Sequence, residues 1–157
     1  MDMIELYSPT LDELGFRQML IADEATMSYN HAYGGTISFS RELWADWYRR
    51  WLGQDSQGKF YRYLRVDGSF VGEVAYHHDK ERNIYLVSII ILASKRGNGY
   101  GKAALSLLCQ EAKKAGIDAL YDDIAFDNPG ITIFYKAGFE IVGRNDETIL
   151  LKKGLNP

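Results

Sequence analysis

Hydrophobic and polar residues recur with different periods along this chain, and each change of period marks the end of one element and the start of another. A period near two predicts a strand, and a period near 3.6 predicts an amphipathic helix. Strands are predicted over residues 3–7, 59–66, 69–77, 84–92, 117–125, 139–143 and 148–152. Helices are predicted from the 10–13 segment to about 23, over 41–52, over 99–115 and from 129 to 138.

Local signals support these boundaries. Thr10-Leu-Asp-Glu13 has the capping-box pattern that starts a helix. Asp67-Gly68 is a strong hairpin signal between two strands. Gly116 stands where a glycine commonly ends a helix. Ser40 is expected to cap the second helix. Leu43, Trp47 and Trp51 are expected to form the apolar stripe of that helix.

The order of these elements is β-α-α-β-β-β-α-β-α-β-β, with antiparallel hairpins first and one crossover helix near the middle. Residues 84–92 are nearly all apolar, as in a strand buried on both faces. No linker, repeat or low-complexity segment interrupts the pattern. The sequence therefore predicts one α+β domain over residues 1–157, with a mixed, mostly antiparallel sheet flanked by helices.

Composition narrows the range of functions. The 157 residues are 46% hydrophobic and carry a net charge of −3, which gives no basic stripe for nucleic acid. Cys109 is the only cysteine, so no internal disulfide can form. The N-terminus has no basic region followed by an apolar one, and no run is long enough to cross a membrane. We expect a cytoplasmic protein that binds neither nucleic acid nor membrane.

The most informative segment is Arg96-Gly-Asn-Gly-Tyr-Gly-Lys102, between the apolar strand and a helix. Backbone N–H groups at a helix start, with glycines that let the backbone approach closely, make an anion site. A P-loop is excluded because Ala103, not Ser or Thr, follows Lys102. A dinucleotide fingerprint is excluded because Lys102 stands where its last glycine belongs.

The segment Arg96-Gly-Asn-Gly-Tyr-Gly101 instead matches Arg/Gln-x-x-Gly-x-Gly/Ala. Together with Asn128-Pro-Gly-Ile-Thr-Ile-Phe-Tyr-Lys-Ala-Gly-Phe139, it resembles the GNAT superfamily of acyl-CoA-dependent N-acetyltransferases over residues 84–140. The resemblance implies a single GNAT-like domain that transfers acetyl from acetyl-CoA to a primary amine. The alternative is a non-catalytic CoA-binding sensor or interaction module.

The resemblance also implies where the cofactor lies. The strand 84–92 would separate from 117–125, and pantetheine would bond to the backbone of Ile89 and Ile91. The residues expected around the rest of the cofactor, its pyrophosphate above all, are Arg96, Gly97, Asn98, Gly99, Tyr100, Gly101, Lys102 and Asn128. A backbone N–H near Ile91 would stabilise the oxyanion. The amine would attack directly, without a covalent enzyme intermediate or a metal.

The groups that move protons stay open at this point. The family usually has an acidic Tyr seven residues after the Asn, and Tyr135 stands at this distance from Asn128. Counting back from Gly138-Phe139 gives Phe134 and Asp127 instead, because one helix residue is missing. For the base, Asp122 and Asp123 stand inside a predicted strand, where Asp is a poor strand former. One of them should point inward, and pairing with a Lys or with backbone N–H is the alternative to catalysis.

Other polar residues receive weaker assignments. Glu73, His77 and His78 lie on the preceding hairpin, and an exposed hairpin face accounts for the histidines better than a metal site does. Tyr29, His31 and Tyr33, in the early aromatic loop, are expected to line the acceptor site. The expected partners are a small-molecule or peptide amine and, as an open alternative, a second copy of the chain in a homodimer.

Overall fold

The computed structural model describes residues 3–30 and 34–156. Its seven strands form one sheet in the order β1-β2-β3-β4-β5-β7-β6, and only the β4–β5 pair is parallel. The strands are β1 Ile4–Tyr7, β2 Lys59–Val66, β3 Ser69–Asp79, β4 Ile84–Ile91, β5 Ala119–Ala125, β6 Glu140–Arg144 and β7 Thr148–Gly154. The helices are α1 Gly15–Ala22, α2 Trp44–Trp51, α3 Tyr100–Lys114 and α4 Ile131–Lys136, with 3-10 turns at Leu11–Glu13, Arg41–Leu43 and Ala93–Lys95.

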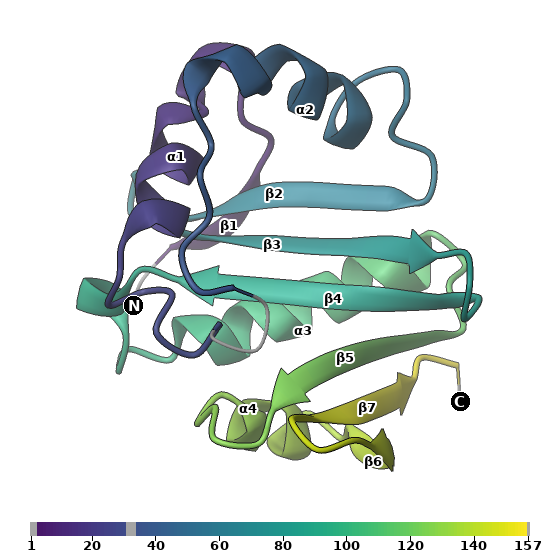
Figure 1. The fold of residues 1–157 in the computed structure, drawn as a ribbon. Coiled ribbons are helices and arrows are strands. Elements are labelled where there is room, and N and C mark those ends of the chain that lie inside the picture. The colour runs from purple at the N-terminus through teal and green to yellow at the C-terminus, as the bar shows by residue number, and fades with distance from the viewer. Residues whose placement is uncertain (1–2, 31–33, 157) are drawn as a thin grey trace.

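The helices cover both faces of the sheet, so two hydrophobic clusters form (Figure 1). On one face, α1 and α2 pack Ile21 and Trp47 against Tyr61 and Tyr63 of β2. On the other face, α3 and α4 pack onto β3, β4, β5 and β7 around Leu105. This arrangement confirms the α+β class and the element order expected from the sequence.

The second helix differs from its expected form. Residues 41–43 form a 3-10 turn, and the α-helix starts at Trp44. The change of helix type rotates the buried face, so Leu43 is 51% exposed and Trp44 is buried. The buried side chains of α2 are therefore Trp44 and Trp47, and Leu43 does not belong to the stripe.

The expected turns are confirmed. Asp67 and Gly68 have φ of 49° and 84°, as a tight hairpin between β2 and β3 requires. Gly116 follows α3 with φ of 81°, the left-handed conformation of a C-terminal glycine.

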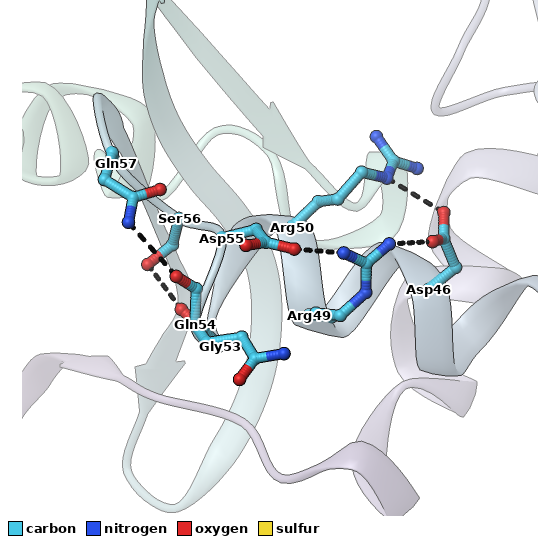
Figure 2. A network of polar contacts seen from close by, with 8 residues as sticks. All are labelled: Asp46, Arg49, Arg50, Gly53, Gln54, Asp55, Ser56 and Gln57. Carbon is cyan, nitrogen blue, oxygen red and sulfur yellow. Dashed lines mark hydrogen bonds and ion pairs between the residues drawn. The ribbon is translucent and has the colours of Figure 1, made fainter.

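The C-terminal end of α2 is fixed by a surface network (Figure 2). Arg49 pairs with Asp46 and with Asp55, and Arg50 donates to Asp46 at 2.9 Å. The hydroxyl of Ser56 donates to the carbonyl of Gly53 at 2.7 Å. The network joins the helix to the turn that leads into β2.

A buried ion pair fixes α1 to the sheet. Arg17 donates to both carboxylate oxygens of Glu73 on β3, at 2.7 and 2.9 Å. The hydroxyl of Tyr61 donates to the same carboxylate, and the guanidinium lies 4.5 Å from the centre of the Trp47 ring. Glu73 is therefore a structural group of this layer, with a partner for its charge.

The sheet opens between β4 and β5. β4 pairs with β3 over the whole length of β4, whereas β4 and β5 share one paired position, Leu86 with Tyr121. Beyond it the two strands separate toward their C-terminal ends (Figure 1). Within the part of the chain that the structure describes, no helix is long and apolar enough to cross a membrane.

Candidate active site

The opening between β4 and β5 holds a cleft of about 730 Å³. Its wall combines side chains from both faces of the sheet, so the cleft passes through the sheet. The strands contribute His77, residues 86–91 and residues 122–125 to the wall of the cleft. The remaining wall is Thr26, Met27, Tyr29, Asn30, Lys95, Arg96, Gly97, Gly99, Tyr100, Gly101, Lys102, Asn128, Pro129, Gly130, Ile133 and Phe134.

The backbone of β4 has its free polar groups on the cleft side at alternate residues. The N–H of Leu92 donates to the carbonyl of Val71 at 2.8 Å, so position 92 faces β3. Because the direction alternates along an antiparallel pair, Ile89 and Ile91 direct N–H and C=O toward β5. These are the two residues expected to bond pantetheine, and both line the cleft.

The glycine loop forms one end of the cleft. Gly97 and Gly99 have φ of 84° and 81°, and a Cβ added to either would lie in open space. Asn98 donates to the carbonyl of Lys95 at 3.0 Å and fixes the turn. The first amides of α3, a helix of 15 residues, follow directly. The loop therefore offers N–H groups and a helix dipole to an anion, with Lys102 beside them.

Arg96 and Gly101 also make contacts that join the loop to the rest of the fold. The guanidinium of Arg96 donates to the carbonyls of Thr26 at 2.6 Å and Ile91 at 3.2 Å, so it joins the early loop to the end of β4. A Cβ on Gly101 would lie 3.1 Å from Cδ1 of Ile133. Gly101 thus permits close contact between α3 and α4.

The two aspartates of β5 point to opposite faces. Asp122 lies on the side of Leu120 and Ile124, which pack beneath α3. Loss of hydration, with the charge of Asp123 as a smaller cause, raises the pKa of Asp122 well above its usual range. Asp123 lies on the α1/α2 side and accepts from Arg82 at 2.9 Å. Both line the cleft.

On α4, Phe134 takes the place expected for an acidic tyrosine. Phe134 is 6% exposed, lines the cleft and packs edge-on against Phe139 with ring centres 5.0 Å apart. Tyr135 is 44% exposed and is not part of the cleft wall. At the other end, Asn128 lines the cleft, and its side-chain oxygen accepts from the N–H of Gly130 at 2.8 Å. Asn128 and Phe134 therefore line the cleft together, whereas Tyr135 does not.

The early loop reaches the cleft through Thr26, Met27, Tyr29 and Asn30. The hydroxyl of Thr26 accepts from the N–H of Ala93 at 2.9 Å and so holds the loop against the end of β4. His31 and Tyr33 lie outside the described residues. No cluster of His, Cys, Asp and Glu fit to hold a metal exists among residues 3–30 and 34–156.

His77 also belongs to the cleft, and the sequence pattern did not indicate this. It lies half-buried on β3, whereas the sequence placed it on an exposed hairpin face. The sequence showed that the side chains of β3 alternate between two faces. It did not show which of these faces would border the opening between β4 and β5.

A mixed sheet that opens between two parallel strands, with a glycine loop at the end of the opening, is the arrangement expected of a GNAT-like domain. The model of the acetyltransferase (GNAT) family matches residues 19–139, and the chain belongs to this family. Family membership confirms the resemblance to the GNAT family that the two sequence motifs indicate.

Individual relatives agree with the family. An uncharacterised N-acetyltransferase of Methanocaldococcus jannaschii is 29% identical over 127 residues, which are 75% of this chain and 56% of that protein. This chain thus spans little more than half the length of that relative.

Solved structures share the fold. An N-acetyltransferase from Staphylococcus aureus superposes with a TM-score of 0.78 at 18% identity, over 99% of both chains. Spermidine N-acetyltransferase from Vibrio cholerae, in complex with CoA and spermine, gives 0.82 at 14% identity, over 97% of this chain and 95% of that one.

Proposed function

We propose that this protein acetylates a primary amine by direct attack of the amine on acetyl-CoA held between β4 and β5. The observation that carries the proposal is the cleft itself, which runs from the glycine loop to the single paired position of β4 and β5. Pyrophosphate would accept from the amides of residues 97–102, and pantetheine would follow Ile89 and Ile91. A non-catalytic CoA-binding module would have the same loop, and turnover separates the two.

The same geometry supports the chemistry at the thioester. The backbone N–H of Ile89 on β4 is directed into the cleft, as that of Ile91 is, and lies nearer along the strand to Leu86 and to Asp122. It would bond the oxygen that becomes negative during attack. The leaving thiolate needs a proton. We assign this role to Asp122 in place of Tyr135, because Asp122 lines the cleft and burial raises its pKa. Asp123 is held by Arg82 and is a weaker candidate for either role.

The acceptor would enter from the α1/α2 side, past the early loop. Tyr29 is 39% exposed and lines the cleft there, together with Met27. His31 and Tyr33 were expected beside it and stay predictions. Spermidine N-acetyltransferase, which shares the fold, is named for a small polyamine. Replacing Tyr29 with Ala should raise the KM for the amine and leave the affinity for acetyl-CoA unchanged. Equal losses for both ligands would mean that Tyr29 is structural.

A homodimer also stays a proposal. Ile141 and Val142 are 42% and 52% exposed on β6, the edge strand of the sheet, and an exposed apolar edge favours association. Sedimentation equilibrium over a range of concentrations tests it, and a constant monomer mass would contradict it.

A thiol-release screen tests the proposed activity. Acetyl-CoA is offered with spermine, an aminoglycoside, a free amino acid, a peptide with N-terminal alanine and Nα-acetyl-lysine, with each amine omitted in turn as the control. At least one amine should release free thiol and gain one acetyl group by mass. Measurable CoA binding without thiol release from any amine would support the sensor and contradict the proposal.

A further inference from the structure

Among the residues that the structure describes, the cleft wall contains one histidine, His77, on the α1/α2 side. His77 of β3 is paired with Leu86 of β4, so its side chain stands one position along the sheet from Ser88, another residue of the wall. Leu86 is also the residue where β4 last pairs with β5. His77 therefore stands on the acceptor side of the sheet, at the closed end of the opening.

The contacts of His77 differ from those of its neighbour. The indole of Trp51 lies edge-on to its ring with centres 6.0 Å apart. Within residues 3–30 and 34–156, neither ring nitrogen of His77 makes a hydrogen bond. His78 points to the other face, where a ring nitrogen bonds the side-chain oxygen of Asn83 at 2.8 Å and the ring lies on Tyr85. Of these two histidines, His77 is the one whose ring nitrogens can bond a molecule in the cleft.

We propose that the imidazole of His77 is the base that takes the proton from the attacking amine nitrogen, directly or through one water. This assignment rests on the proposed acetyl transfer. It replaces the aspartates as the base, because the aspartate on this face, Asp123, is bonded to Arg82 at 2.9 Å.

The surroundings favour the neutral ring that a base must have. Partial burial is the largest cause that lowers the pKa of His77 below its usual value of 6.5. The charges of Lys59 on β2, of Arg82 in the β3–β4 turn and of His78 act in the same direction, and Asp79 opposes them. Asp123 faces the cleft from β5, and α2 contributes the uncharged Trp51. At pH 7 the ring is mostly unprotonated and can accept a proton.

The proton balance closes with this assignment. The amine reaches the cleft uncharged, after its ammonium form has released one proton to solvent. Its lone pair forms the C–N bond, and the nitrogen, now acidic, gives a proton to His77. The C–S bond breaks with its electron pair on sulfur, and sulfur takes the proton of Asp122. Solvent then carries the proton of the imidazolium back to Asp122, so amide and free thiol are the products.

The test compares His77→Gln with His78→Gln, a matched change one residue away on the opposite face. The amine is the one that the screen above shows to be turned over fastest. For His77→Gln we expect kcat at pH 7 to fall by about 10²–10⁴-fold, the usual loss when a general base is removed. The acidic limb of the wild-type profile, which should lie below pH 6.5, should disappear. His78→Gln should keep both the rate and the limb.

Calorimetry with acetyl-CoA shows whether each variant is folded and binds the cofactor, and we expect unchanged affinity for both. If His77→Gln keeps the wild-type rate and limb, the inference is wrong while the acetyl transfer stands. If His77→Gln loses cofactor affinity in parallel with rate, His77 is structural and the inference is also wrong. If the wild-type protein releases no thiol with any amine, the proposed function fails and the inference with it.

Discussion

Tyr135 and Phe134 are neighbours on α4, and the helix turns only the phenylalanine toward the cleft. Spacing from Asn128 selected Tyr135, and spacing from Gly138 selected Phe134. The sequence does not decide between these two spacings, because it does not show at which turn a short helix has lost a residue. Asn128 and Phe134 line the cleft, and neither hydroxyl of α4, on Thr132 or on Tyr135, is part of its wall.

The first prediction follows for Tyr135. Tyr135→Phe removes only an exposed hydroxyl outside the cleft, so kcat should stay unchanged across pH. Asp122→Asn is the comparison, and it should lower kcat by about 10²–10⁴-fold if Asp122 supplies the thiolate proton. Steady-state thiol release measures both. A large loss in Tyr135→Phe with full activity in Asp122→Asn would reverse the two roles.

Asp122 also predicts a dependence of stability on pH. The pKa of Asp122 is raised in the folded protein. Burial of this carboxyl therefore costs the least stability at low pH, where it is protonated in both the folded and the unfolded state. As the pH rises above about 3.9, the unfolded state ionises first and the penalty grows until the folded group ionises. Asp122→Asn removes this penalty, so it should raise Tm more at pH 8 than at pH 4. Thermal unfolding monitored by circular dichroism measures the difference, and an equal shift at both values would contradict the burial of this carboxyl.

At the scale of elements, the start of α3 gives the sharpest prediction. Gly99→Ala places a side chain at φ of 81° and should cost about 1–2 kcal/mol of stability. It also adds a methyl group beside the amides expected to hold pyrophosphate, so affinity for CoA should fall. Gly116→Ala is a matched control, since Gly116 has the same φ of 81°, open space around its Cβ position and a place at the other end of α3.

Calorimetry with CoA and denaturant titration measure the two effects separately. Both variants should lose similar stability, and only Gly99→Ala should lose affinity. Similar affinities in both variants would show that the loop does not hold the pyrophosphate.

Elements with strong local signals were predictable from the sequence. The β2–β3 hairpin was predictable because Asp67-Gly68 accepts positive φ, and the C-terminal end of α3 because Gly116 does. The start of α2 was not, because a 3-10 turn over residues 41–43 turns Leu43 outward without changing the apolar pattern. The glycine loop follows β4 and precedes α3, as the sequence predicted, but two contacts within it could not be predicted. Gly101 packs against Ile133 and Arg96 bonds two carbonyls, and both depend on segments distant in sequence.

At the scale of the whole molecule, the buried pair of Arg17 and Glu73 joins the α1/α2 layer to the sheet. Their side chains are 13% and 7% exposed. Glu73→Gln leaves the guanidinium without its counter-charge, so it should cost about 3–5 kcal/mol of unfolding free energy. Glu5→Gln is the control, because the paired side chains of Arg65 and Glu5 are 30% and 43% exposed. This exposed pair should contribute about 1 kcal/mol or less. Urea denaturation measures both free energies of unfolding. Equal losses would contradict the claim that the buried pair stabilises the fold more than the exposed pair does.

The relation between the two layers also explains why His77 was missed. The sequence predicted a separation of residues 84–92 from 117–125 through the family resemblance, and the single pairing of Leu86 with Tyr121 agrees with it. The residues that border the opening on the α1/α2 side come from β3 and from the early loop. Their meeting depends on the register of β3 with β4 and on the contact of Thr26 with Ala93, neither of which a periodic pattern contains.

The position of the cofactor is the central claim, and a crystal structure of the protein with bound acetyl-CoA tests it most directly. We predict pyrophosphate oxygens within hydrogen-bond distance of the amides of residues 97–102. Pantetheine should lie between β4 and β5 against the backbone of Ile89 and Ile91, with the acetyl group facing the side of His77. Acetyl-CoA bound elsewhere, with the opening between β4 and β5 empty, would contradict the account.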